Sequence, residues 1–213
     1  MKLETIKKYF FPSSILDIGA NKGQFRQLAL DVFPGCEILS IEANPNCEPY
    51  LRQLTNDFVI ALLAKDETTY DFHVSKVNPT STGNSIYREL TPHFSDSNST
   101  SVQVKASTLD NLLCGRTFDL VKIDTQGSEL DIICGGRSTC QLAKGVLLET
   151  SVIPYNSSAP LHNEVVSFMY SMGFDVGDVV DVKRKSYELD GKKVDVFQQD
   201  VLFLNRKYFN LKS

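Results

Sequence analysis

The 213-residue sequence lacks long hydrophobic runs and has no excess of basic residues. No stretch approaches the ~18 consecutive apolar residues that a membrane-spanning helix needs. The net charge is −4, whereas nucleic-acid-binding domains usually carry a basic face. We therefore expect neither a membrane span nor a nucleic-acid partner.

Paired cysteines and metal-ligand spacings are also absent. The five cysteines are odd in number and form no CxxC pair, so the sequence indicates neither a disulfide framework nor a zinc site. The acidic residues between 66 and 96 do not have the spacing of a calcium site, and we expect no metal. The apolar run near the start is too short for a signal peptide. These features favour a reduced, cytoplasmic location.

What is present is an alternation of short aliphatic runs with segments of helical periodicity. The runs suit strands buried on both faces of a parallel sheet; they are 15–18, 37–41, 58–62, 120–123 and 145–148. The segments 24–33, 129–134 and 162–172 are predicted helices, the first with a clear apolar face. The order predicts a doubly wound α/β fold, and the length fits one domain, residues 1–213.

Two regions depart from this alternation. Residues 75–101 include 14 Ser, Thr or Asn residues among 27, and strand-like segments flank them. A polar connection of this length in a compact domain is usually a functional lid or a disordered insertion. Near the end, 174–182 and 194–204 are predicted as two strands joined by a hairpin around Asp190-Gly191.

The strongest local signal is the segment ILDIGANKGQF, residues 15–25. It places a glycine turn between a strand and a helix, where open α/β sheets bind ligands. In a dinucleotide-binding turn the second glycine lets the backbone approach a pyrophosphate, but here that position is Asn21. A side chain there leaves room for a ligand without a pyrophosphate, such as S-adenosylmethionine.

An acidic residue follows at the end of the next predicted strand. Glu42 lies 19 residues after Gly23, where a carboxylate can accept hydrogen bonds from both ribose hydroxyls. Asp17 is placed to meet an ammonium group of the ligand. The simpler interpretation is that Gly19 and Gly23 only form a tight turn and that Glu42 is a solvated cap. Strand, glycines and Glu42 together favour an adenosine-containing cofactor.

Five motifs occur in order between residues 15 and 150. They are ILDIGANKGQF (15–25), SIEANP (40–45), STLDNL (107–112), FDLVKIDTQGSELDIICGG (118–136) and LLET (147–150). In this order and spacing they resemble the FkbM-type methyltransferases. That family comprises S-adenosylmethionine-dependent class I enzymes, mostly O-methyltransferases that act on hydroxyls of sugars or natural products. The resemblance implies a Rossmann-like, seven-stranded, mostly parallel sheet with an antiparallel C-terminal strand.

The resemblance also implies which residues bind S-adenosylmethionine. The implied cofactor residues are Asp17, Gly19, Ala20, Asn21, Gly23 and Gln24 in the loop, Glu42 at the ribose, Ala43 and Asn44 beside the adenosine, Leu62 and Leu63 against the adenine, and Asp124 beside the methionine part. Many relatives have Glu where this chain has Gln126, although relatives with Gln also occur.

Methyl transfer to a hydroxyl needs a base during attack. The candidate catalytic residues are Asp124 and Glu149, which end predicted strands, and His93, which lies in the polar segment 75–101. A lone loop histidine is more often solvated than catalytic. Glu129 begins a predicted helix, and a carboxylate there also stabilises a helix N-terminus.

Lys122 is unusual because it lies in a predicted buried strand. A buried ammonium without a partner would destabilise the fold or lose its charge. We therefore expect an acidic partner, either Asp17 or Glu149, and a structural or orienting role for Lys122.

The sequence as a whole predicts an S-adenosylmethionine-dependent methyltransferase with a small-molecule or glycan acceptor. Residues 75–101 would form the acceptor lid, with Tyr87 and Phe94 against a sugar ring and Arg88 near an acidic group. One alternative is a nicotinamide-dependent oxidoreductase on the same fold, which Asn21 argues against. Another is a catalytically silent cofactor-binding module, whose sign would be a damaged cofactor loop.

Overall fold

A computed structural model of the chain describes residues 1–189 and 192–210. Within them, seven strands form one sheet in the order β3-β2-β1-β6-β7-β9-β8. The strands are β1 (Ser14–Ile18), β2 (Glu37–Glu42), β3 (Phe58–Ile60), β6 (Leu120–Ile123), β7 (Gly145–Ser151), β8 (Phe174–Leu189) and β9 (Lys192–Asn205). The first five pair in parallel, and β9 is antiparallel to both β7 and β8. This arrangement confirms the predicted doubly wound, mostly parallel sheet with an antiparallel C-terminal part.

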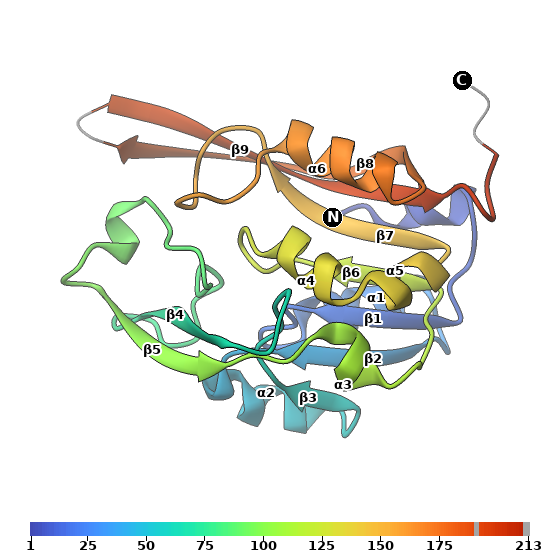
Figure 1. The fold of residues 1–213 in the computed structure, drawn as a ribbon, viewed down its shortest axis with the longest axis horizontal. Helices are drawn as coiled ribbons and strands as arrows, with labels where there is room; N and C mark the ends of the chain where they lie inside the picture. Colours follow the sequence, from blue (N-terminus) through green and yellow to red (C-terminus); the bar gives the residue numbers. More distant parts are fainter. Residues whose placement is uncertain (190–191, 211–213) are drawn as a thin grey trace.

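Helices cover both faces of the sheet (Figure 1). They are η1 (Leu3–Lys8), α1 (Gln24–Val32), η2 (Pro45–Cys47), α2 (Glu48–Leu54), α3 (Leu109–Leu113), α4 (Glu129–Gly135), α5 (Arg137–Leu142) and α6 (His162–Ser171). Successive strand residues point to opposite faces. Leu16 and Val121 therefore pack with α3 to α6, whereas Ile15 and Leu120 pack with η1 and α1.

The predicted elements agree with the structure, with differences at their ends. The strand predicted at 58–62 ends at Ile60, and Leu62 and Leu63 follow it as a connection. The helices α2, α3 and α5 were not predicted, and each has only five to seven residues; α4 is equally short, but its apolar run stopped by two glycines was recognised. A helix this short shows less than two turns of periodicity.

The polar segment 75–101 is partly strand. A separate two-stranded antiparallel sheet is formed by β4 (Thr69–Ser75) and β5 (Ser99–Lys105). The connection between them includes the short helix η3 (Pro92–Phe94). In Figure 1 this connection, in green, lies beyond the carboxyl ends of the parallel strands.

The C-terminal hairpin is longer than predicted. β8 and β9 pair from Phe174 to Leu189, with irregular register between Val176 and Asp178 and between Val179 and Asp181. The predicted turn at Asp190-Gly191 lies outside the described residues. Figure 1 shows the hairpin extending past the sheet on the side where the 75–101 segment lies. In the part of the chain that the structure describes, every helix is too short or too polar to span a bilayer.

Candidate active site

A cavity of about 370 Å³ opens where β1, β2 and β6 end. Parallel strands end at one edge of the sheet, so loops far apart in sequence meet there. Nine of the predicted cofactor residues line the cavity: Gly19, Ala20, Asn21, Gln24, Glu42, Ala43, Leu62, Leu63 and Asp124. The others, Asp17, Gly23 and Asn44, lie behind these loops rather than on the cavity wall.

The glycine turn is pressed against the end of β6. Gly19 has φ +76°, and a Cβ built on it would lie 1.9 Å from the carbonyl oxygen of Asp124. Gly23 has φ +85°, and its added Cβ would meet Leu54 of α2 at 2.5 Å. Gly19 therefore lets the cofactor loop approach β6, whereas Gly23 lets α1 begin against α2.

Glu42 fixes two loops at the end of β2. Its Oε2 accepts a hydrogen bond from the main-chain N–H of Asn21 at 2.7 Å, and its Oε1 accepts one from that of Asn44 at 2.8 Å. Burial raises the pKa of Glu42 above its usual value. A carboxylate can accept about four hydrogen bonds, so acceptor capacity remains for a ligand in the cavity.

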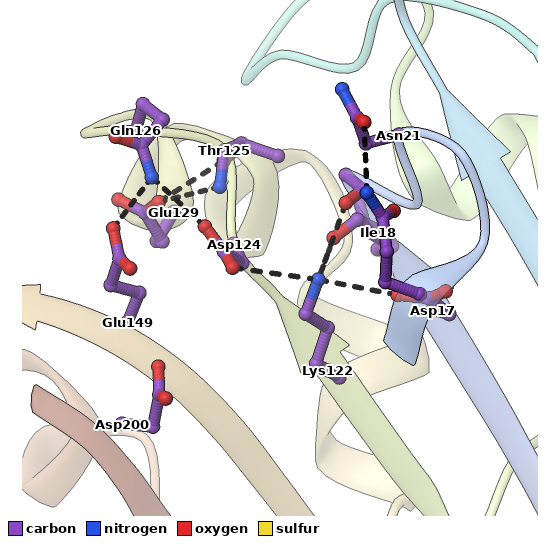
Figure 2. Close-up of polar contacts among 12 residues, drawn as sticks. Asp17, Ile18, Asn21, Lys122, Asp124, Thr125, Gln126, Glu129, Glu149 and Asp200 are labelled. Carbon is purple, nitrogen blue, oxygen red and sulfur yellow. Dashed lines mark hydrogen bonds and ion pairs between the residues drawn. The ribbon is translucent and has the colours of Figure 1, made fainter. Parts of the chain in front are cut away.

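Lys122 has Asp17 as its acidic partner, one of the two expected. Its Nζ lies 3.3 Å from Oδ1 of Asp17 and 3.7 Å from Oδ2 of Asp124, and it donates to the carbonyl of Gly19 at 3.3 Å (Figure 2). Burial would lower the pKa of Lys122, but Asp17 and Asp124 raise it above its usual value. Asp17 is fully buried, so this pair ties the cofactor turn to β6.

Glu129 satisfies the backbone of the loop before its own helix. It accepts hydrogen bonds from the main-chain N–H groups of Thr125, at 2.8 Å, and Gly127, at 3.0 Å. Burial raises its pKa to about 7. These contacts support the structural interpretation of Glu129.

Glu149 lies behind Asp124, away from the cavity lining. It accepts hydrogen bonds from Gln126 Nε2 at 2.6 Å, Gln198 Nε2 at 3.0 Å and Lys183 Nζ at 3.1 Å. Burial, followed by the nearby charge of Asp124, raises the pKa of Glu149 to about 8. Glu129 and Glu149, whose carboxyl groups could otherwise transfer a proton or bind a metal, thus already have protein partners. Among the described residues, no three His, Cys, Asp or Glu side chains are grouped as metal ligands.

The polar segment 75–101 is in contact with the cofactor loops. The side-chain amide of Asn21 donates to the carbonyl of Thr80 at 3.1 Å, and that of Asn44 donates to the carbonyl of Pro79 at 2.6 Å. Ser85 Oγ donates to the carbonyl of Thr125 at 2.9 Å. The segment contributes Ser81, Thr82, Asn84, Ser85 and Ile86 to the cavity lining.

Other residues of this segment lie away from the cavity. His93 is exposed and outside the lining, and Phe94 is fully buried beside Gly83. The Tyr87 hydroxyl donates to Asp131 at 2.6 Å, and Arg88 pairs with Asp96 at 2.7 Å. From the sequence we expected these four residues at the acceptor site, but the structure places all four outside the cavity lining.

Two site residues had no functional signal in the sequence. Like Gln24, Phe25 and Leu28 of α1, Lys183 and Asp181 of β8 line the cavity. They reach it only through the register of the C-terminal hairpin, which pairs Asp181 with Asp200 and places Asp200 beside Glu149. Periodicity does not encode such a register.

Comparisons with known proteins agree with this geometry. A family model for the methyltransferase FkbM domain matches residues 17–176. No curated protein matches the sequence. A proposed RNA methyltransferase of Pyrococcus horikoshii has a similar structure, with 10% identity, coverage of 95% of this chain and 79% of the other, and a TM-score of 0.51.

Two further structures are similar. The precorrin-6y C5,15-methyltransferase of Geobacter metallireducens shares 14% identity over 95% of this chain and 87% of its own, with a TM-score of 0.50. The methyltransferase FkbM of Methylobacillus flagellatus shares 13% identity over 88% of this chain and 43% of its own, with a TM-score of 0.48. At these identities the likeness concerns the fold alone.

The fold is that of class I methyltransferases. Since the family model covers most of the sequence, the chain belongs to the FkbM methyltransferase family, whose methyl donor is S-adenosylmethionine.

Proposed function

We propose that this chain binds S-adenosylmethionine in the cavity and transfers its methyl group to a hydroxyl of a sugar, glycan or natural product. The observation that carries the proposal is the close approach of the Gly19 turn to the Asp124 carbonyl, in a cavity that both Glu42 and Asp124 line. Asn21 occupies the position where a dinucleotide would need glycine. A donor without a pyrophosphate fits these residues.

Each part of the donor has suitable residues. Glu42 would accept hydrogen bonds from the ribose hydroxyls, and Leu62 and Leu63 would contact the adenine ring. The amino-acid part would lie beside Asp124, which also places the sulfonium methyl there. When bound, the donor supplies the methyl group and the leaving thioether.

The acceptor would occupy the end of the cavity between α1 and β8. Phe25 and Leu28 provide apolar surface there, and Lys183 provides a polar group. The hydroxyl and amide side chains of the 75–101 segment, which we propose as the acceptor lid, suit an acceptor with several hydroxyls. During transfer the acceptor oxygen forms a bond to the methyl carbon, the bond from carbon to sulfur breaks, and the hydroxyl proton leaves to a base. Asp124 is the candidate base that lines the cavity.

Calorimetric titration with S-adenosylmethionine and S-adenosylhomocysteine tests donor binding. We expect both to bind and NAD not to bind. Incubation with labelled S-adenosylmethionine and a panel of sugars and hydroxylated natural products then tests transfer. Binding of NAD without binding of S-adenosylmethionine would favour the oxidoreductase alternative, and donor binding without transfer to any acceptor would favour the silent module.

A further inference from the structure

Gln126 joins the side chain of Asp124, which lines the cavity, to that of Glu149, which lies behind it. Its Nε2 donates to Oδ1 of Asp124 at 3.0 Å and to Oε1 of Glu149 at 2.6 Å (Figure 2). No role for Gln126 was predicted from the sequence. One neutral amide thus connects the residue that follows β6 with a buried residue of β7.

As a result, Asp124 is held at both of its carboxylate oxygens. Gln126 donates to Oδ1, and the Lys122 ammonium lies 3.7 Å from Oδ2. Contacts at both oxygens restrict rotation of the carboxylate. Each oxygen retains capacity for a further hydrogen bond. Asp124 and Lys122 line the cavity, whereas Gln126 and Glu149 do not.

The backbone at Gln126 is in an unfavourable conformation. Its φ is +58°, in the left-handed region, where a Cβ is too close to the following carbonyl. Such conformations persist where the surroundings fix them, often at functional sites. Here Glu129 fixes the loop by accepting from the main-chain N–H groups of Thr125 and Gly127. The loop therefore projects the Gln126 amide toward Asp124 at a cost in backbone energy.

Charged groups on β1, β6, β7, β8, β9 and α4 interact electrostatically with Asp124. They are Asp17 of β1, Lys122 of β6, Glu149 of β7, Lys183 of β8, Asp200 of β9 and Glu129 of α4. Among them Gln126 supplies donors without adding a charge. An ionised Glu at this position would offer only acceptors to the Asp124 and Glu149 oxygens that accept from Gln126.

We propose that Gln126 is a positioning residue that orients the Asp124 carboxylate toward the amino-acid end of the methyl donor. The inference rests on the proposed function, which places that end of the donor beside Asp124. The adenosine end lies against Glu42 and Leu62. Loss of the Gln126 amide should therefore weaken ligands that carry the amino-acid part and spare ligands that lack it.

Two ligands separate these cases: S-adenosylhomocysteine, which has the amino-acid part, and 5′-methylthioadenosine, which lacks it. Calorimetry would compare wild type with Gln126→Met, which keeps the length but has no donors, and with Gln126→Gly, which also relieves the left-handed backbone. We expect both variants to bind S-adenosylhomocysteine about tenfold more weakly, as for loss of a hydrogen bond to a charged group. Binding of 5′-methylthioadenosine should change by less than about twofold.

The matched control is Gln103→Met. Gln103 of β5 also donates its amide to a carboxylate, that of Asp71, but lies outside the cavity lining, and its loss should leave both affinities unchanged. Equal weakening of both ligands by the Gln126 variants, or no weakening of either, would overturn the positioning role. If wild type binds neither ligand, the proposed function is wrong and the positioning role fails with it.

Discussion

The side-chain amide of Asn21 donates to the main-chain carbonyl of Thr80 at 3.1 Å, which joins the cofactor loop to the proposed lid. Asn21 has φ +47°, a conformation that Asn tolerates better than most residues. We therefore expect a donor bound in the cavity to dissociate more slowly while the 75–101 segment keeps this contact with the cofactor loop.

Asn21→Asp tests this contact. Asp also tolerates the left-handed backbone, but it replaces the donor by a carboxylate facing a carbonyl. We expect S-adenosylhomocysteine to dissociate about 3–10 times faster, as for the loss of one hydrogen bond, in stopped-flow measurements. Asn98→Asp is the control, because Asn98 donates to the Pro92 carbonyl at 3.1 Å within the segment and away from the cavity. Equal dissociation rates in the two variants would contradict the contact's role.

Gly19→Ala should abolish donor binding because its Cβ would overlap the Asp124 carbonyl, a main-chain atom that cannot move without shifting β6. Gly35→Ala separates this effect from backbone strain. Gly35 has φ +83° with no atom within 4 Å of an added Cβ, so we expect it to cost about 1–2 kcal/mol of stability with donor affinity unchanged. Calorimetry and urea unfolding measure both quantities. Retention of donor binding by Gly19→Ala would refute the close-approach argument.

Lys122→Met should lower the free energy of unfolding by about 3–5 kcal/mol, because it leaves the buried Asp17 carboxylate without its partner. Replacement of both residues, Asp17→Leu with Lys122→Met, should recover most of this loss. Lys144→Met removes a comparable pair, Lys144 with Asp119 at 2.8 Å, that is partly exposed, and should cost less than about 1 kcal/mol. Urea unfolding of the four proteins checks the order. A double variant as unstable as Lys122→Met alone would show that the pair is not the cause.

Stability should fall as the pH rises from about 4.5 to 7. Glu129 has a folded pKa of about 7 against an ordinary value of 4.5. Above pH 4.5 the unfolded chain releases a proton that the folded chain retains, so unfolding becomes more favourable until the folded group also ionises. Glu129 alone contributes on the order of 2–3 kcal/mol to this decline.

The measurement is the free energy of unfolding in urea at several pH values. Glu149 and Asp200, whose pKa values burial raises to about 8 and about 6, add to the same slope. Glu129→Gln should make the slope shallower between pH 5 and 7, whereas Glu4→Gln, at an exposed residue, should leave it unchanged. A slope that Glu129→Gln does not alter would mean that Glu129 is ionised throughout.

The sequence by itself determined the order of the strands in the main sheet and of helices α1, α4 and α6. It also determined the turn at Gly19 and limited the acidic partner of Lys122 to two candidates, Asp17 and Glu149. These features depend on local chemistry. Buried parallel strands need continuous apolar runs, the turn at Gly19 needs a positive φ, and a buried ammonium needs a carboxylate.

Only the tertiary structure decided which of these residues face the cavity. Asp17 and Gly23 belong to the predicted cofactor segment, yet Asp17 pairs with Lys122 behind the turn and Gly23 packs on α2. Lys183 reaches the site through the register of β8 on β9. Gln126 reaches Asp124 because its own backbone is left-handed. The 75–101 segment is held at the site by hydrogen bonds from Asn21 and Asn44. Such contacts join residues far apart in the chain, and they depend on side-chain direction and strand register, which hydrophobic periodicity and motif spacing leave undetermined.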